Sequence, residues 1–318
     1  MLHARPSSYD ISIIVPVFNC EAYLDDCINS LLRQRGVALE LIFVNDGSTD
    51  RSASVIEEYC KQHSNILLVS QPNSGVVAAR NRGIELAKGR YMLFVDADDS
   101  IVEDSLQEIL SVADKEQTDV LQLTHYAKYD DGRQSARKLH PVSVCTDGIS
   151  YFKLMQKKRT LIAAPYNHLV RSEFLKALPF RFIKELPRCQ DLEFFTKVML
   201  KAKRIRNYTK PYYIYKIGTA IGGSGTRKNF SLLFECYEAI KKSFSNFASE
   251  EHLGAEMARR LDYLICSHIY GYSADVFKQL PADKRAHWIK FIRKHIFYNC
   301  GWMRPHLYLK MYRLNKTL

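Results

Sequence analysis

Residues 39–50 read Leu-Glu-Leu-Ile-Phe-Val-Asn-Asp-Gly-Ser-Thr-Asp, an apolar run that ends abruptly in a polar, turn-forming cluster. The same change from apolar to polar residues occurs within 11–19 and within 91–99. Each apolar run is short and rich in β-branched or aromatic residues, which indicates a buried strand. Between the runs, apolar residues recur at helical spacing, as in 23–34. Strands that alternate with helices in this way predict an α/β fold with a parallel sheet.

The alternation predicts individual elements along the chain. We expect strands at 11–17, 39–45, 66–70, 91–95 and 120–126, and helices at 23–34, 52–63, 76–88 and from about Val102, where Ser100 and Glu103 form a capping-box pattern. After Asp130 the alternation weakens, with further strands expected at 205–208 and 212–215. From about residue 228 onward the sequence is mostly helical in pattern.

Three of the expected strands end in polar clusters, at 18–19, 45–48 and 96–99. Ligands of an open parallel sheet bind at the carboxyl edge of the strands, so these clusters predict one site. The segment Phe18–Glu21 contains no glycine, which argues against a dinucleotide-binding Gly-x-Gly-x-x-Gly turn. A bound diphosphate would then need another source of positive charge. The three carboxylates within 96–99 indicate a divalent metal ion, Mn²⁺ or Mg²⁺, because these ions prefer oxygen ligands.

Four motifs follow one another in this part of the chain. They are Ile-Val-Pro-Val-Phe-Asn at 14–19, Val-Asn-Asp-Gly-Ser-Thr-Asp at 44–50, Asn-Ser-Gly-Val-Val-Ala-Ala-Arg-Asn-Arg-Gly at 73–83 and Phe-Val-Asp-Ala-Asp-Asp at 94–99. In order and spacing they resemble the nucleotide-binding half of the family 2 glycosyltransferases, which have the GT-A type fold. This resemblance is far more specific than an isolated Asp-x-Asp.

The resemblance implies a domain organisation as well as a fold. A GT-A type, Rossmann-like glycosyltransferase domain would span 1–225. Its nucleotide-sugar-binding half would be 10–130 and its acceptor-side half 131–225. A mostly helical C-terminal region would follow at 226–318.

The resemblance also assigns residues to the nucleotide. Pro16, Phe18 and Glu21 would border the nucleobase, and Asp46 would contact it. Asp96 would lie against the ribose. The expected donor is a nucleotide-diphosphate sugar, with UDP as the expected nucleotide.

A metal ion would bridge the donor's phosphates. By resemblance, Asp98 would bind this Mn²⁺ or Mg²⁺, Arg80 would lie near the nucleotide, and Asn81 would support the Asp-x-Asp turn. Residues 1–100 hold 9 Lys and Arg against 13 Asp and Glu, a net charge of −4. An acidic nucleotide half needs a cation to hold a diphosphate, so the charge agrees with the metal.

These residues also have ordinary structural explanations. Residues 98–100 could cap the following helix, and 46–48 could form a simple turn. Arg80 and Arg82 could be solvated charges on a helix.

The catalytic base is expected in the second half of the chain. Residues 188–195 read Arg-Cys-Gln-Asp-Leu-Glu-Phe-Phe, and Asp191 aligns with the family's aspartate that deprotonates the acceptor hydroxyl. Gln190 replaces the usual glutamate of the family. The alternatives are that Asp191 only caps the helix that follows, or that Glu193 is the base.

Two other features resemble acceptor-side elements of the family. Asn167 and His168 resemble its Asn-Lys-Leu pattern, with His in place of Lys, although a packed histidine explains the pattern equally well. The Gly222–Gly225 loop falls where a mobile segment closes over the donor, or it forms a hairpin.

Composition restricts the remaining possibilities. The chain has 318 residues, 47% of them hydrophobic, and a net charge of +12. No run reaches the roughly 20 apolar residues of a membrane span, and 1–10 lacks the apolar run of a secretory signal. We therefore expect a cytoplasmic protein with reduced cysteines. Residues 284–318 are basic and aromatic without one acid, which predicts either a helix pair on the anionic inner face of the membrane or helices packed on the core.

The resemblance predicts inverting, metal-dependent transfer of a sugar to a hydroxyl of a glycan or lipid-linked oligosaccharide acceptor in surface polysaccharide synthesis. A nucleotidyltransferase is the enzymatic alternative, but the Gly-rich, Lys-containing loop typical of that class is missing after the first strand. A nucleic-acid-binding protein is favoured only by the net charge, and we expect no nucleic acid as partner.

Overall fold

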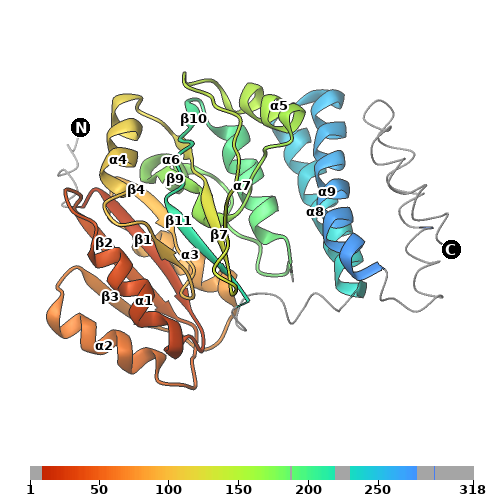
Figure 1. Ribbon diagram of the computed structural model, residues 1–318. Helices are drawn as coiled ribbons and strands as arrows, with labels where there is room; N and C mark the ends of the chain where they lie inside the picture. The colour runs from red at the N-terminus through yellow and green to blue at the C-terminus, as the bar shows by residue number, and fades with distance from the viewer. Residues whose placement is uncertain (1–8, 187, 219–229, 278–289, 291–318) are drawn as a thin grey trace. The chain divides into compact units, whose positions relative to one another are not determined.

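The computed structural model describes residues 9–186, 188–218, 230–277 and 290, and the chain divides into two compact units (Figure 1). The larger unit comprises Met1–Glu185 and Gln190–Gly222, and the smaller one Leu186–Cys189 and Gly223–Leu318. The expected boundary at 225/226 and the Gly222–Gly225 loop lie outside the described residues. So do residues 284–318, apart from Lys290.

A seven-stranded sheet in the order β10-β6-β9-β4-β1-β2-β3 forms the centre of the larger unit. Its strands are β1 (Ile11–Val17), β2 (Leu39–Asn45), β3 (Ile66–Ser70), β4 (Tyr91–Phe94), β6 (Val120–Gln122), β9 (His168–Arg171) and β10 (Ile205–Asn207). The pairs β1–β2, β2–β3, β1–β4 and β6–β10 are parallel, as predicted. Strand β9, which the sequence did not predict, lies antiparallel between β4 and β6. Val17 pairs with Asn45, so β1 and β2 end level with each other at one edge.

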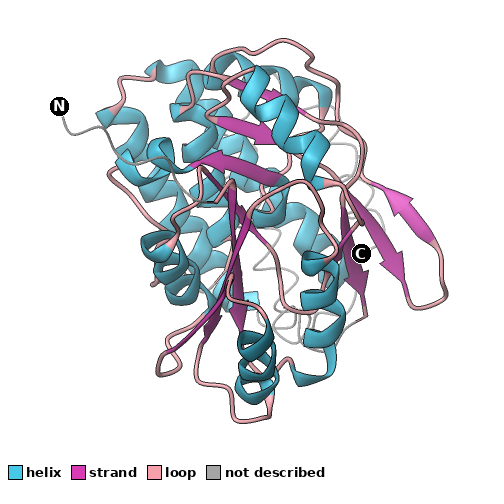
Figure 2. Ribbon diagram, turned by 90° about the vertical axis from the view of Figure 1, so that its left-hand side faces the viewer, coloured by secondary structure: helices cyan, strands magenta, loops and turns pink. Residues whose placement is uncertain are grey.

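Helices cover both faces of this sheet (Figure 2). On one face, Ile11, Ile13 and Val15 of β1 share a core with α1 (Glu21–Leu32), α2 (Ser52–Gln62) and α4 (Leu106–Lys115). On the other face, Ile14 shares a core with α3 (Val76–Leu86), α5 (Gly148–Lys158), α6 (Ser172–Ala177) and α7 (Gln190–Lys201). Successive residues of β1 therefore supply two separate cores, as expected for a sheet buried on both sides. The α/β fold class predicted from the sequence is confirmed.

A smaller sheet of four strands, in the order β5-β11-β7-β8, lies within the same unit. Its strands are β5 (Ser100–Ile101), β11 (Tyr213–Ile217), β7 (His125–Tyr129) and β8 (Gln134–Ala136). In Figure 1, β11 and β7 run side by side in parallel register.

This sheet corrects two expectations. The helix expected near Val102 begins only at Leu106, because Ser100 and Ile101 instead pair with β11 and the amide of Ile101 donates to the Ser30 hydroxyl. The single strand expected at 120–126 is two strands in different sheets. The chain leaves the large sheet at Leu123, whose amide donates to the carbonyl of Asn167.

The smaller unit contains the helices α8 (Phe230–Glu250) and α9 (Gly254–Phe277), in agreement with the helical pattern of the sequence. The two helices pack through buried apolar side chains, among them Ile240, Phe244 and Leu261. His252 in the turn between them has φ 51°, and Gly254, the first residue of α9, has φ 74°. Within the described residues, neither of these helices nor any other has the length and apolar character to span a membrane.

Helix α5 can approach the end of α7 only because residue 148 is glycine. A Cβ atom at Gly148 would lie 1.8 Å from the carbonyl oxygen of Met199, and the Gly148 amide donates to the Ala202 carbonyl at 2.8 Å. The obstructing atom belongs to the backbone, so it cannot rotate away.

We expect Gly148→Ala to lower the free energy of unfolding by roughly 3 kcal/mol through overpacking. Ser150→Ala, an exposed change in the same helix, is the matched control and should stay within about 0.5 kcal/mol of wild type. Urea denaturation measures both. Equal unfolding midpoints for Gly148→Ala and wild type would show that the two helices are not packed this closely.

Candidate active site

The loops after β1 and β2 are joined by hydrogen bonds at the carboxyl edge of the sheet. Asn19, at φ 51°, donates its amide to the Ser48 hydroxyl at 3.1 Å. The Glu21 carboxylate accepts from the amide of Arg51 at 3.0 Å. Both loops are held in place by these contacts, and Phe18 is left 43% exposed beside them. An exposed aromatic ring on a fixed loop can form one wall of a nucleobase site.

Asp46 is almost completely buried, and its carboxylate organises the segment that leads into α3. One carboxylate oxygen accepts from the Gln71 side chain at 2.7 Å and the Ser74 amide at 2.9 Å, and the other accepts from the Gly75 amide at 2.7 Å. The next residue, Gly47, has φ 75°, and a Cβ atom there would lie 2.8 Å from the Asn73 nitrogen. Asp46, which the resemblance places against the nucleobase, thus shapes the loop that leads into α3.

Val76 is a further candidate for the nucleobase site that sequence reasoning missed. It is 42% exposed and directly follows Gly75, whose amide binds Asp46. Asp46 in turn donates its amide to the carbonyl of Val17, next to Phe18. Asp46 thus bonds to Val17 and to Gly75. Each of these two residues directly precedes an exposed apolar side chain, Phe18 or Val76. Pro16 is less accessible, since it lies half-buried within β1 and pairs with Val44.

Asp99 is a structural residue of the Asp-x-Asp segment. It is 1% exposed, and it accepts from the Tyr213 hydroxyl at 2.7 Å and from the Lys216 amide at 2.8 Å. Burial, with the nearby charge of Asp96 as a further cause, raises the pKa of Asp99 to about 8. The Tyr213 oxygen also accepts from the Asp96 amide at 3.1 Å. Tyr213, which the sequence did not single out, thus connects the segment to β11 while its ring stacks on Tyr166 at 4.1 Å.

Arg80 joins the two sides of the site. Its guanidinium donates to Asp191 at 2.7 Å and to Asp96 at 3.0 Å. The Arg80 side chain is 6% exposed, whereas Asp96 and Asp191 keep 30% and 34% of their side-chain surface exposed. Desolvation raises the pKa of Asp191, and the positive charge of Arg80 opposes that rise. One buried cation therefore connects the residue expected at the ribose with the expected base, and Arg80 and Asp191 are 111 residues apart in the sequence.

The neighbour of Arg80 corrects one expectation. Asn81 does not support the Asp-x-Asp turn, because its side chain donates to the Phe182 carbonyl at 2.9 Å and accepts from the Phe182 amide at 3.1 Å. The ring of Phe182 lies 5.8 Å from the Arg80 guanidinium. Asn81 therefore fixes the aromatic ring against which Arg80 rests.

Asp191 and Glu193, the two candidates for the catalytic base, differ in their burial. Glu193 is 1% exposed and forms an ion pair with Lys197. A general base must reach the proton that it removes, so the partly exposed Asp191 is the better candidate. Asp191 lies in the first turn of α7, as predicted.

His168 is a packed, neutral residue. It is fully buried, and burial lowers its pKa to about 3. Its Nδ1 lies 3.0 Å from the Ala164 carbonyl, to which only a protonated Nδ1 can donate. Its ring stacks on Phe195 at 4.3 Å. The structural explanation of the Asn167-His168 pair therefore holds, since the Asn167 side chain is buried too and donates to the Leu123 carbonyl at 3.0 Å.

The carboxylates of this edge fit a metal ion only in part. Across residues 9–186, 188–218 and 230–277, no three His, Cys, Asp or Glu side chains form a group that could hold a metal. Asp96 is engaged by Arg80, and Asp99 by Tyr213. The resemblance assigns the cation to half-buried Asp98, with the substrate's phosphates as the other expected ligands. This ligand set is typical of Mg²⁺ and suits Mn²⁺, which bind through one or two carboxylates plus phosphates.

Comparison with known proteins identifies the family. Residues 12–186 match the family described as glycosyl transferase family 2. The chain belongs to this family. The putative glycosyltransferase EpsH of Bacillus subtilis is 30% identical over 261 residues, which cover 81% of this chain and 74% of that protein. The uncharacterized glycosyltransferase EpsJ of the same organism is 32% identical over 208 residues, 65% of this chain and 60% of its own length.

Solved structures confirm the fold of this glycosyltransferase. TarS of S. aureus, residues 1–349 in complex with UDP, superposes with a TM-score of 0.67 at 22% identity, covering 88% of this chain and 78% of that one. The GT-A type fold expected from the motifs is thereby confirmed. Membership of the family favours glycosyl transfer over the nucleotidyltransferase and nucleic-acid-binding alternatives.

Arg80→Gln tests the connection between the two sides of the site. We expect the transfer rate to fall about 10²-fold, because Asp191 loses the partner that orients it. Only ionised Asp191 can accept a proton, so activity falls as the pH drops through its pKa. Removing Arg80 raises that pKa, and the acid limb of the kcat profile should move to higher pH.

Arg82→Gln is the matched control on the same helix. Arg82 is exposed and pairs with Glu85 at 3.1 Å on its own helix, so its loss should change the rate less than about twofold. An Arg80→Gln enzyme with an unshifted acid limb would show that Arg80 does not act on the base.

Proposed function

We propose that this glycosyltransferase transfers a sugar from a UDP-sugar to a hydroxyl of a glycan or lipid-linked glycan, with inversion and with Mn²⁺ or Mg²⁺. The observation that carries the proposal is the Asp96–Arg80–Asp191 bridge, which brings donor-side and acceptor-side carboxylates together. TarS has been crystallised with UDP and with UDP-GlcNAc. The poly(ribitol-phosphate) beta-glucosyltransferase of Bacillus spizizenii is 26% identical over 296 residues, 90% of this chain and 44% of that protein. These relatives support synthesis of a cell-surface polymer.

The nucleobase would lie between the loops after β1 and before α3. Phe18 and Val76 would contact its faces and edge, since each is exposed and apolar. The buried Asp46 would hold the loop at the correct distance and present a polar edge to the base. Glu21 and Pro16 would border this site. Glu21 holds the amide of Arg51, and Pro16 pairs with Val44 in the sheet.

The phosphates would lie at Asp98, where the Asp-x-Asp segment reaches the edge of the sheet. A divalent ion held by Asp98 would act as a Lewis acid toward the departing diphosphate. Asp96, fixed through its amide by Tyr213 and through its carboxylate by Arg80, would face the ribose. The buried Asp99 keeps this segment attached to β11.

The acceptor hydroxyl would bind beside Asp191. Its proton passes to the Asp191 carboxylate while its oxygen attacks the anomeric carbon, and the bond from that carbon to the diphosphate breaks on the opposite side. This displacement inverts the configuration and needs no covalent enzyme intermediate. Asp191 suits the role because its raised pKa makes it a stronger base than an exposed aspartate.

Two variants separate donor binding from catalysis. Asp98→Ala should abolish metal-dependent binding of a UDP-sugar, measured by calorimetry with and without Mn²⁺. Asp191→Asn should keep that binding within about twofold and lower transfer by about 10² to 10⁴, the range for loss of a general base. Glu57→Gln, an exposed change on α2, is the control. Transfer at the normal rate by Asp191→Asn would refute the base assignment, and equal activity in chelator would refute the metal.

The C-terminal segment is a candidate for contact with an anionic membrane surface at the cytoplasmic side. Residues 284–318 contain 9 Lys and Arg and no Asp or Glu. We expect the protein to sediment with vesicles that contain phosphatidylglycerol, and to be released by high salt. Binding to neutral vesicles to the same extent would contradict an electrostatic contact.

A further inference from the structure

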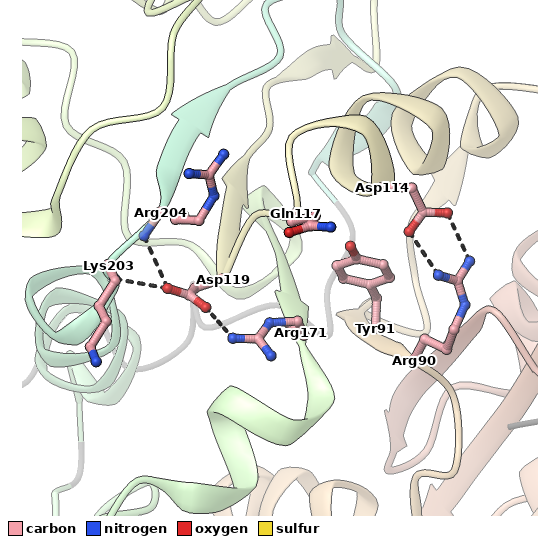
Figure 3. A pocket seen from close by; sticks show the side chains of 8 residues that line it. All are labelled: Arg90, Tyr91, Asp114, Gln117, Asp119, Arg171, Lys203 and Arg204. Carbon is pink, nitrogen blue, oxygen red and sulfur yellow. Dashed lines mark hydrogen bonds and ion pairs between the residues drawn. The ribbon is translucent and has the colours of Figure 1, made fainter. Parts of the chain in front are cut away.

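A cavity with a volume of about 510 Å³ lies in the larger unit, apart from the candidate active site (Figure 3). It is lined by Arg90, Tyr91, Asp114, Gln117, Asp119, Arg171, Lys203 and Arg204. All eight side chains carry polar groups, and none is aliphatic. The volume falls within the range of about 300 to 1,000 Å³ that is usual for small-molecule sites.

The cavity lies at the opposite end of the strands from the proposed donor site. Tyr91 begins β4, while Asp119 and Arg204 directly precede β6 and β10. These strands begin at this edge, whereas Asp98 follows the end of β4. A ligand in the cavity would therefore be separate from the UDP-sugar.

Ion pairs and backbone hydrogen bonds build the walls before any ligand binds. Asp114 accepts two hydrogen bonds from Arg90, each 2.8 Å long, at one end of the cavity. Asp119 forms an ion pair with Arg171 and accepts from the amides of Lys203 at 2.8 Å and Arg204 at 3.0 Å. The two acids are thus occupied by protein donors, so they hold the walls in place rather than compete for a ligand.

Backbone contacts add to this rigidity. The Arg171 amide donates to the Asp119 carbonyl at 2.9 Å, and the Asp119 amide donates to the Arg204 carbonyl at 2.8 Å. Figure 3 shows Lys203 and Arg204 at one end of the cavity, the Arg90–Asp114 pair and Tyr91 at the other, and Arg171 and Gln117 between them. Such a preformed site loses little entropy when a ligand binds.

One buried donor of the lining has no partner among the described residues. It is the Arg171 Nε. The Tyr91 hydroxyl is not such a donor, because it already bonds to Asp114, and burial together with this contact raises the pKa of Tyr91 to about 12.

Two cations of the lining are not neutralised by an acid. Asp10 and Glu173 bind Arg90 and Arg171 from outside the lining, at 2.9 and 3.3 Å. Within the described ranges, the side chains of Lys203 and Arg204 form no ion pair, and the Arg204 guanidinium donates to the Glu116 carbonyl. The positive charge without an acidic partner is therefore that of Lys203 and Arg204, two exposed neighbours at one end of the cavity.

We propose that this cavity is a second, non-catalytic binding site for the phosphate ester of a sugar or polyol. Two unpaired cations match the two negative charges of a phosphate monoester, and guanidinium donors such as the Arg171 Nε suit its oxygens. The polar lining then provides partners for the hydroxyl groups of the ligand. The proposal depends only on the larger unit and does not rest on the donor or the base.

Calorimetric titration with glycerol 3-phosphate tests the site in the full-length protein, with UDP and Mn²⁺ present in excess to occupy the donor site. We expect wild type to bind the ester. Lys203→Gln/Arg204→Gln should raise the Kd at least ~10-fold, the effect of losing two unit charges near the anion. The matched control, Lys157→Gln/Lys158→Gln, removes the same charge from the exposed end of α5 and should change the Kd less than about twofold.

Gln117→Glu is a second variant that breaks no hydrogen bond of the described structure. It places a negative charge inside the cavity, and it should weaken binding at least ~10-fold, while Gln134→Glu on exposed β8 should not. Absence of binding to wild type at 10 mM ester (about the weakest Kd worth measuring), displacement of the ester by UDP, or equal losses in test and control variants would each overturn the proposal. Failure of the ester to bind would leave UDP-sugar binding and transfer unaffected, so it is distinguishable from failure of the proposed function.

Discussion

The guanidinium of Arg80 lies almost completely buried between the carboxylates of Asp96 and Asp191. Burying a charge costs free energy unless partners of opposite charge and good geometry accompany it. Here the partners come from the segment after β4 and from the first turn of α7, while Arg80 itself is on α3. These three elements must keep one relative position for the charges to be satisfied. The same requirement places the expected base next to the donor side of the site.

The acidic residues of this edge have different tasks, and burial separates them. Asp46 and Asp99 are buried, and their oxygens accept hydrogen bonds from the loop before α3 and from β11. Asp98 and Asp191 keep accessible surface, so they can meet phosphates, a cation or an acceptor. Carboxylates that shape the site therefore differ from those proposed to act in it. The tyrosine at 213 connects the groups, because its hydroxyl touches both the Asp96 amide and the Asp99 carboxylate.

The two edges of the sheet differ in the charge of the side chains that remain available to a ligand. At the carboxyl edge, carboxylates predominate, and the proposed donor site would need a cation to hold a diphosphate. At the opposite edge, Asp114 and Asp119 are paired within the protein, and the described part of the chain offers no acidic partner to the side chains of Lys203 and Arg204. An acidic donor site and a basic cavity can therefore coexist in one unit, because the length of the strands separates them.

The sequence by itself predicted the strands of the expected nucleotide-binding half. Strands such as Leu39–Asn45 and Ile66–Ser70 were predicted with their observed bounds, because short apolar runs bounded by turn-forming residues give a local signal. The motifs also identified the family and the residues at the strand ends. Local patterns failed where a partner distant in the sequence decided the outcome. Ser100 and Ile101 pair with β11 instead of capping a helix, and Asn81 binds Phe182 rather than the neighbouring turn.

Only the tertiary structure decided how the site is connected. The contact of Arg80 with Asp191, the burial of Glu193 and His168, and the basic cavity all join segments separated by tens of residues or more. Burial and charge pairing depend on which surfaces meet after folding, and a sequence motif contains no information about a partner that lies outside it. The sequence therefore indicated the chemistry of the side chains. Their access to substrate could be determined only from the folded chain.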